Sequence, residues 1–270
     1  PSTTPTATST SVRPPTATRP PTTTQPAPGS ITLPPADGVL DYQIGGAYQP
    51  DADVDIVDRD HTDDPVPGKY NICYVNGYQT QPGSLGSWPA GAVLRDASGD
   101  LVEDKGWPGE YMLDTRTAAS RDLVAGVVHG WMTGCRDAGF DAVEIDNLDT
   151  YTRTSLLTQA GNLALATLFV RDAHALGLAI GQKNTVEIAA QGRRQIGFDF
   201  AIAEECQVYD ECGDYMSAYG NQVYEVEYPD AGGRSNFERA CAARGARISI
   251  TYRDRNVAPR GRSSYVFEHC

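Results

Sequence analysis

The chain has 270 residues and a formal net charge of −13 at neutral pH. This acidic balance argues against nucleic acid and anionic lipid as partners, because both carry negative charge themselves. It suits a cationic substrate, although secreted proteins are often acidic whatever they bind. No apolar run is long enough to span a bilayer, so we expect no membrane insertion.

Residues 1–34 consist almost entirely of Pro, Thr, Ser and Ala. Such a segment has too few apolar side chains to offset the entropy of ordering it, so we predict a disordered linker. Residues 35–270 hold nearly all the apolar content and form one predicted domain. A linker of this kind favours a secreted, extracellular protein, which an upstream segment could attach to the cell surface.

Short apolar runs alternate with helical patterns along the domain, which is typical of parallel strands covered by helices. Strands are predicted at Tyr42–Gly46, Val54–Val57, Tyr70–Val75, Ala142–Asp146, Leu178–Gln182, Phe200–Ala203, Gln222–Val226 and Arg247–Thr251. Helices are predicted at Ala118–Ala138, Ser155–Leu176 and Phe237–Arg244. The aperiodic stretch after the third strand predicts a long loop that helps to build a site. The predicted fold class is α/β. The domain at 35–270 is close in length to the roughly 250 residues of a typical (β/α)8 barrel, so we predict a barrel of this kind.

Six cysteines without metal-ligand spacing favour disulfides over a zinc site in a secreted chain. Cys206 and Cys212 are close enough in sequence to close a short loop. Cys241 and Cys270 would tie the last helix to the C-terminus. Cys73 and Cys135 could be paired or remain buried thiols.

Acidic residues end two of the predicted strands. Asp141, Glu144 and Asp146 lie in one run, and Glu204 and Glu205 lie in the other. In a barrel of parallel strands, these ends meet at one mouth, where one carboxyl group donates a proton while another attacks or stabilises a cation. Such acids can instead cap a helix or pair with arginine, but two acid-bearing strand ends favour catalysis.

Six segments together resemble glycoside hydrolase family 114, the endo-α-1,4-polygalactosaminidase-like barrels. They are NICYVNGY at 71–78, GWPGEYMLDTR at 106–116, GFDAVEIDNLDTY at 139–151, HALGLAIGQKN at 174–184, FDFAIAEECQVYDEC at 198–212 and VYEVEY at 223–228. The resemblance covers most of residues 38–270 and leaves out the linker. It implies a (β/α)8 barrel, in agreement with the strand count.

The resemblance implies that Asp146, which precedes Asn147, and Glu204, the first acid of the sixth-strand motif, are catalytic. Alternation along a strand lets only one of Glu204 and Glu205 face the barrel mouth, and the motif alone selects Glu204. Here Glu205 stands where the family more often has Gln. We assign Glu204 as general acid/base and Asp146 as nucleophile or cation stabiliser.

Further polar and aromatic residues lie at strand ends or in the long loop and are predicted to bind substrate. They are Asp60, Tyr74, Asn76, Trp107, Glu110, Glu144, Lys183, Asn184, Glu205, Glu227 and Tyr228. Trp107 could stack on a sugar ring or simply pack. Lys183 and Asn184 could bind substrate or hold an acid ionised. His61 lies among acids, but a solvated loop is favoured over a metal site.

The resemblance implies hydrolysis of α-1,4 bonds in a galactosamine-rich polysaccharide, a cationic amino-sugar polymer. We expect the protein to be a monomer. No cofactor is expected, since a carboxylate pair can perform the reaction alone. Two other interpretations stay open. One is a glycosidase for another α-linked polysaccharide, neutral or partly N-acetylated, and the other is a non-catalytic carbohydrate-binding barrel.

Overall fold

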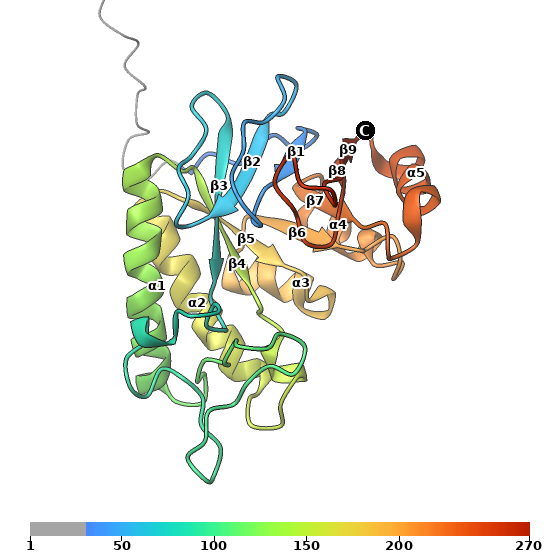
Figure 1. The fold of residues 1–270 in the computed structure, drawn as a ribbon. Helices are drawn as coiled ribbons and strands as arrows, with labels where there is room; N and C mark the ends of the chain where they lie inside the picture. The colour runs from blue at the N-terminus through green and yellow to red at the C-terminus, as the bar shows by residue number, and fades with distance from the viewer. Residues whose placement is uncertain (1–30) are drawn as a thin grey trace, which may run out of the picture.

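A computed structural model describes residues 31–270, and the predicted linker is outside this range except for its last four residues (Figure 1). One sheet contains all strands in chain order, with β1 to β8 parallel and β9 antiparallel to β8. The strands are β1 (Leu40–Tyr42), β2 (Ile56–Asp60), β3 (Tyr70–Asn76), β4 (Ala142–Asp146), β5 (Ala179–Lys183), β6 (Phe200–Glu204), β7 (Val223–Glu227), β8 (Ser249–Arg253) and β9 (Phe267–His269).

The sheet curves into a nearly closed barrel, which confirms the predicted (β/α)8 architecture. Between the first and eighth strands, the Thr251 hydroxyl donates a hydrogen bond of 2.7 Å to the Leu40 carbonyl oxygen. The helices are α1 (Ala118–Ala138), α2 (Gln159–Leu176), α3 (Ala189–Gln191), α4 (Cys212–Tyr219) and α5 (Gly233–Arg244). Helices α1 and α2 lie side by side against the sheet (Figure 1). In the described part of the chain, no helix is both long and apolar enough to cross a membrane.

Local signals in the sequence set the helix ends. The Thr117 side chain accepts a hydrogen bond from the Ser120 amide at the start of α1, and Gly139 ends that helix at φ +104°. Helix α2 begins four residues later than predicted, because Thr158 caps it by accepting from the Gly161 amide. Helix α4 and strand β9 were not predicted.

The first strand is shifted from its predicted position at Tyr42–Gly46, since β1 ends at Tyr42. The chain turns there, and the Gly46 amide donates to the Gln43 carbonyl. Gly45 permits a close approach, because a Cβ at this position would lie 2.4 Å from the Val257 carbonyl oxygen.

Side chains alternate between the barrel interior and the helices. The interior is filled by apolar side chains at Leu40, Tyr42, Ile56, Ile72, Ala142, Ala179, Phe200, Ile202, Tyr224, Val226 and Tyr228. The last inward positions, at the carboxyl ends of β3, β4, β5 and β6, are polar, namely Asn76, Asp146, Lys183 and Glu204. The same period that fills the core therefore places charged groups at one mouth.

Residues 31–34, which the sequence placed in the linker, contact the opposite mouth. Ile31 packs against the apolar interior, and the Tyr70 hydroxyl donates to the Thr32 carbonyl at 2.6 Å. The Tyr224 hydroxyl donates to the Pro34 carbonyl at 2.9 Å. This segment covers the amino-terminal ends of the strands.

Three disulfides join the six cysteines. Cys73–Cys135 links β3 to α1, which decides the pair that the sequence left open. The two expected pairs, Cys206–Cys212 and Cys241–Cys270, are also present. The first of these closes the loop after β6, and the second ties α5 to the C-terminal residue.

The long loop at 77–117 extends beyond the carboxyl end of β3, at the bottom of Figure 1. It folds back on itself through isolated antiparallel bridges, which pair Gln79 with Met112, Val93 with Leu113, Arg95 with Leu101 and Glu103 with Tyr111. The loop therefore has a defined path beside the mouth.

Gly181 on β5 gives the Phe200 ring its space in the interior, since a Cβ on Gly181 would lie 2.5 Å from the ring. We expect Gly181→Ala to lower the free energy of unfolding by about 1–3 kcal/mol through overpacking. Gly126→Ala is the control, because this glycine lies within α1 and a Cβ there meets nothing within 4 Å. The control should gain about 0.5–1 kcal/mol. Equal effects in denaturant unfolding would contradict this packing.

Candidate active site

The centre of the mouth is the Lys183 ammonium at the end of β5. Its Nζ lies 3.1 Å from Glu144 Oε1, 3.2 Å from Glu204 Oε2 and 3.6 Å from Asp146 Oδ1, and it donates to the Tyr42 hydroxyl at 2.9 Å. Burial lowers the pKa of Lys183, but the surrounding carboxylates outweigh burial and raise it well above its usual value. The Lys183 side chain is only 2% exposed, yet its ammonium group therefore stays charged. The sequence allowed Lys183 either to bind substrate or to hold an acid ionised, and this geometry favours the second role.

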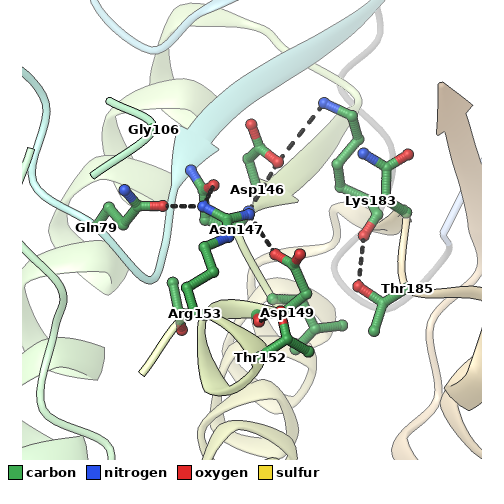
Figure 2. A network of polar contacts seen from close by, with 12 residues as sticks. Gln79, Gly106, Asp146, Asn147, Asp149, Thr152, Arg153, Lys183 and Thr185 are labelled. Carbon is green, nitrogen blue, oxygen red and sulfur yellow. Dashed lines mark hydrogen bonds and ion pairs between the residues drawn. The ribbon is translucent and has the colours of Figure 1, made fainter. Parts of the chain in front are cut away.

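Asp146 ends β4 and is held by donors on both oxygens. The Tyr74 hydroxyl donates to Oδ2 at 2.8 Å, and the Asn147 amide donates to Oδ1 at 2.7 Å. The backbone turns sharply at Asn147, which has φ +66°. Figure 2 shows Asp146 beside Lys183, with the ion pair drawn between them.

Glu204 ends β6 and receives three contacts. Asn184 Nδ2 donates to Oε2 at 2.9 Å, while the Tyr228 hydroxyl forms a short hydrogen bond to Oε1. Burial raises the pKa of Glu204, but the Lys183 ammonium and these two donors reverse the effect and bring the pKa below its usual value. Asn184 is further fixed because its Oδ1 accepts from the Glu204 amide at 2.9 Å.

Asp146 and Glu204 are the partly exposed members of the cluster. Their side chains are 19% and 24% exposed, whereas Glu144 is fully buried. Their nearest oxygens lie within about 7 Å of each other, because Lys183 Nζ is 3.6 Å from one and 3.2 Å from the other. Two carboxylates at this spacing can flank one glycosidic bond.

The structure distinguishes Glu204 from its neighbour Glu205. Glu205 has φ +60° and turns away to form an ion pair with Arg255, which also pairs with Asp230 at 3.1 Å. The Arg255 guanidinium lies 4.2 Å from the centre of the Tyr228 ring. Glu204 is thus the acid that faces Lys183, as the motif predicted.

The long loop supplies one wall of the mouth. Asn76 Nδ2 donates to Glu110 Oε2 at 3.4 Å, and the Gln79 amide donates to Asn76 Oδ1 at 3.0 Å. Burial, together with the charges of Asp146 and Asp104, raises the pKa of Glu110 to about 7. The loop therefore places a titrating carboxyl group beside Asp146.

Arg153, in the loop after β4, connects this wall to the barrel. Its Nη1 donates to Gln79 Oε1 at 2.6 Å, Asp104 Oδ2 at 2.8 Å and Asn147 Oδ1 at 2.9 Å, and its Nη2 pairs with Asp149 (Figure 2). The sequence did not predict this network, because its members meet only after the long loop folds back. Tyr42 was also missed, since it reads as an ordinary core residue.

Two predicted substrate-binding residues lie at the rim, away from Lys183. The oxygens of Asp60 accept from Thr62 and from Gln81 Nε2, the latter at 2.6 Å, so Asp60 ties β2 to the long loop. Trp107 is 57% exposed on that loop. Such exposure favours a stacking surface over the packing alternative.

Glu227 is not brought to the mouth. It lies on the face of β7 opposite to Tyr228, where it accepts from the Gln207 amide at 3.0 Å and from Asn236 Nδ2 at 2.8 Å. Burial raises its pKa to about 8, and the neighbouring Glu225 adds to the shift while the Gln207 amide opposes it. Glu225 in turn pairs with Arg244 at 2.9 Å. This cluster joins β7 to α5.

The family model for glycoside-hydrolase family GH114 matches residues 20–270. The chain belongs to this family. It is therefore a glycoside hydrolase, and the match begins within the segment predicted as a linker. A comparison with curated protein sequences found no match.

Two solved structures share the fold. The structure of Ega3 from Aspergillus fumigatus in complex with galactosamine is 22% identical, covers 92% of this chain and 98% of its own, and has a TM-score of 0.69. The glycoside hydrolase domain of PelA from Pseudomonas aeruginosa is 14% identical, covers 88% of this chain and 99% of its own, and has a TM-score of 0.55. Both likenesses extend over nearly the whole barrel.

Glu227→Gln tests the cluster between β7 and α5. Because the folded pKa of about 8 is above the unfolded value, Glu227 contributes stability at low pH that is lost as pH rises toward 8. The free energy of unfolding of the variant should therefore rise relative to wild type by up to about 1.4 kcal/mol per pH unit between pH ~5 and ~8. Exposed Glu238→Gln is the control and should follow wild type. Parallel curves for Glu227→Gln and wild type would contradict the assignment.

Proposed function

We propose that this chain is a secreted hydrolase that cleaves α-1,4 bonds within galactosamine-rich polysaccharide, with Asp146 and Glu204 as its catalytic pair. The observation that carries the proposal is the placement of both carboxylates, partly exposed, around the buried ammonium of Lys183. A hydrolase of this class needs no further group for the reaction.

The surroundings of the pair favour roles opposite to those assigned from the sequence. Glu204 is stabilised as a carboxylate by Lys183, Asn184 and Tyr228, and its lowered pKa opposes carrying a proton in the free enzyme. Glu204 therefore acts as nucleophile or as the charge that stabilises the cationic transition state. Asp146 is left to donate a proton to the glycosidic oxygen as the bond from that oxygen to the anomeric carbon breaks.

The charge of the mouth supports an amino-sugar substrate. Asp146, Glu204 and Glu110 border the opening, and Glu110, whose pKa is about 7, can pair with an ammonium group. Ega3, which shares the fold, was solved with galactosamine, and this supports the same sugar here. Exposed Trp107 offers a face on which a ring can stack.

Secretion is supported by the disulfides, because all six cysteines are paired in the described part of the chain. Disulfides persist in oxidising compartments and are rare in the cytosol. A polysaccharide too large to cross a membrane would also be met outside the cell.

The catalytic pair can be tested with two isosteric variants. Glu204→Gln should lose on the order of 10³-fold or more in kcat on every substrate, since it removes the stabilising charge. Asp146→Asn should lose about 10²- to 10⁴-fold on polysaccharide. On an aryl glycoside of a galactosamine oligomer, whose leaving group needs no proton, the Asp146 variant should lose less than about tenfold.

Glu205→Gln is the matched control for this pair. It removes the adjacent charge at the same strand end, and we expect kcat to stay within about tenfold of wild type. Near-normal turnover by Glu204→Gln, or a greater loss in Glu205→Gln, would overturn the assignment of the catalytic acids.

The degree of acetylation tests the substrate. Release of reducing ends should be fastest from deacetylated galactosamine polymer and should fall about tenfold or more on the fully N-acetylated polymer, since acetylation removes the ammonium charges. Added salt should raise KM for the deacetylated polymer alone. Cleavage of a neutral glucan, with no cleavage of galactosamine polymer, would favour another α-linked substrate. Binding without any reducing ends would indicate a non-catalytic barrel.

A further inference from the structure

Asp58 is a fully buried carboxyl group beneath the proposed catalytic pair. It lies in the middle of β2, in register with Tyr42 on β1 and Ile72 on β3. Within residues 31–270, no N–H or hydroxyl group donates to either of its oxygens. The side chain instead lies in hydrogen-bonding contact with the carboxyl group of Glu144.

Glu144 also has one buried carboxyl oxygen that accepts no hydrogen bond from an N–H or hydroxyl group of the described chain. Its Oε1 accepts from the Tyr42 hydroxyl at 2.9 Å and lies 3.1 Å from Lys183 Nζ, whereas Oε2 is buried and, in the described chain, receives no N–H or hydroxyl donor. Contact with the Asp58 carboxyl group supplies the missing partner. Two ionised carboxylates in such a contact, with both side chains fully buried, would repel each other strongly.

One proton between the two groups removes the repulsion, and the surroundings decide where it resides. Glu144 faces an ammonium and a hydroxyl, so the negative charge belongs there. Asp58 has neither in hydrogen-bonding contact, so the proton belongs on Asp58. In agreement, burial first and then the charge of Glu144 raise the pKa of Asp58 well above its usual value, Asp146 adds to the rise, and Lys183 opposes it.

We propose that Asp58 is a positioning residue that stays protonated and donates its hydrogen bond to Glu144, which holds Glu144 against Lys183. Glu144 then has three donors, from β1, β2 and β5. Lys183 is held centrally and shared among Glu144, Asp146 and Glu204. Without the Asp58 donor, Glu144 would compete more strongly for the ammonium and leave Glu204 less stabilised. This effect on activity rests on the function proposed above.

The test compares Asp58→Asn, which keeps a neutral donor of the same shape, with Asp58→Leu, which removes it. Asp58→Asn should keep kcat within about threefold of wild type and leave its pH profile unchanged. Asp58→Leu should lower kcat more than about tenfold with little change in KM, and should move the acidic limb of the profile to higher pH. A loss in Asp58→Asn as large as that in Asp58→Leu would overturn the proposal.

A second measurement depends on neither activity nor the folding of Asp58→Leu. In wild type, Asp58 carries a proton in the folded state and loses it on unfolding above pH ~4, whereas the asparagine side chain in Asp58→Asn binds no proton. The ratio of the wild-type unfolding equilibrium constant to that of Asp58→Asn should therefore rise about tenfold per pH unit above pH ~4. A ratio that does not change with pH would overturn the proposal. If the wild-type enzyme cleaves no galactosamine polymer while this ratio changes as expected, the proposed function fails and the protonated Asp58 stands.

Discussion

The buried ammonium of Lys183 is the interaction on which the whole mouth of the barrel depends. Three carboxylates from two strands approach a single cation that is 2% exposed. Without that cation, their mutual repulsion and the cost of burying them would oppose the fold. The ammonium therefore both stabilises the mouth and keeps Glu204 ionised. A surface ion pair could do neither, because water would screen it.

Strand geometry places the two proposed catalytic carboxylates around this cation. Side chains alternate along each parallel strand, so Asp146, Lys183 and Glu204 point inward at the same edge. Below them, the interior is filled by apolar side chains, and Glu144 and Asp58 are fully buried there. The depth of a carboxyl group in the barrel thus sets its chemistry. We propose that Asp58, the deepest, is neutral and that Glu144, the next, is a fixed charge, whereas Asp146 and Glu204 are partly exposed and are the pair proposed to reach substrate.

The sequence predicted the features that depend on neighbouring residues. Strand β4 has its predicted bounds, α1 ends where its capping residues stand, and Glu204 rather than Glu205 faces the mouth. Contacts between distant segments could not be predicted in this way. The Arg153 network forms only when the long loop folds back beside the barrel. Glu227 was wrongly expected in the mouth, because neighbouring residues on a strand point to opposite faces and Tyr228 is the one that points inward. The burial of Asp58 could not be predicted either, since it depends on all of the surrounding strands.

The most direct test of the central claim is a crystal structure of the Glu204→Gln variant with a galactosamine oligosaccharide. We expect one glycosidic oxygen within hydrogen-bonding distance of Asp146, and the adjacent anomeric carbon beside residue 204, with Lys183 still beneath both. Flanking amino groups should lie near Glu110. An oligosaccharide bound elsewhere on the barrel, with no sugar between Asp146 and residue 204, would contradict the account.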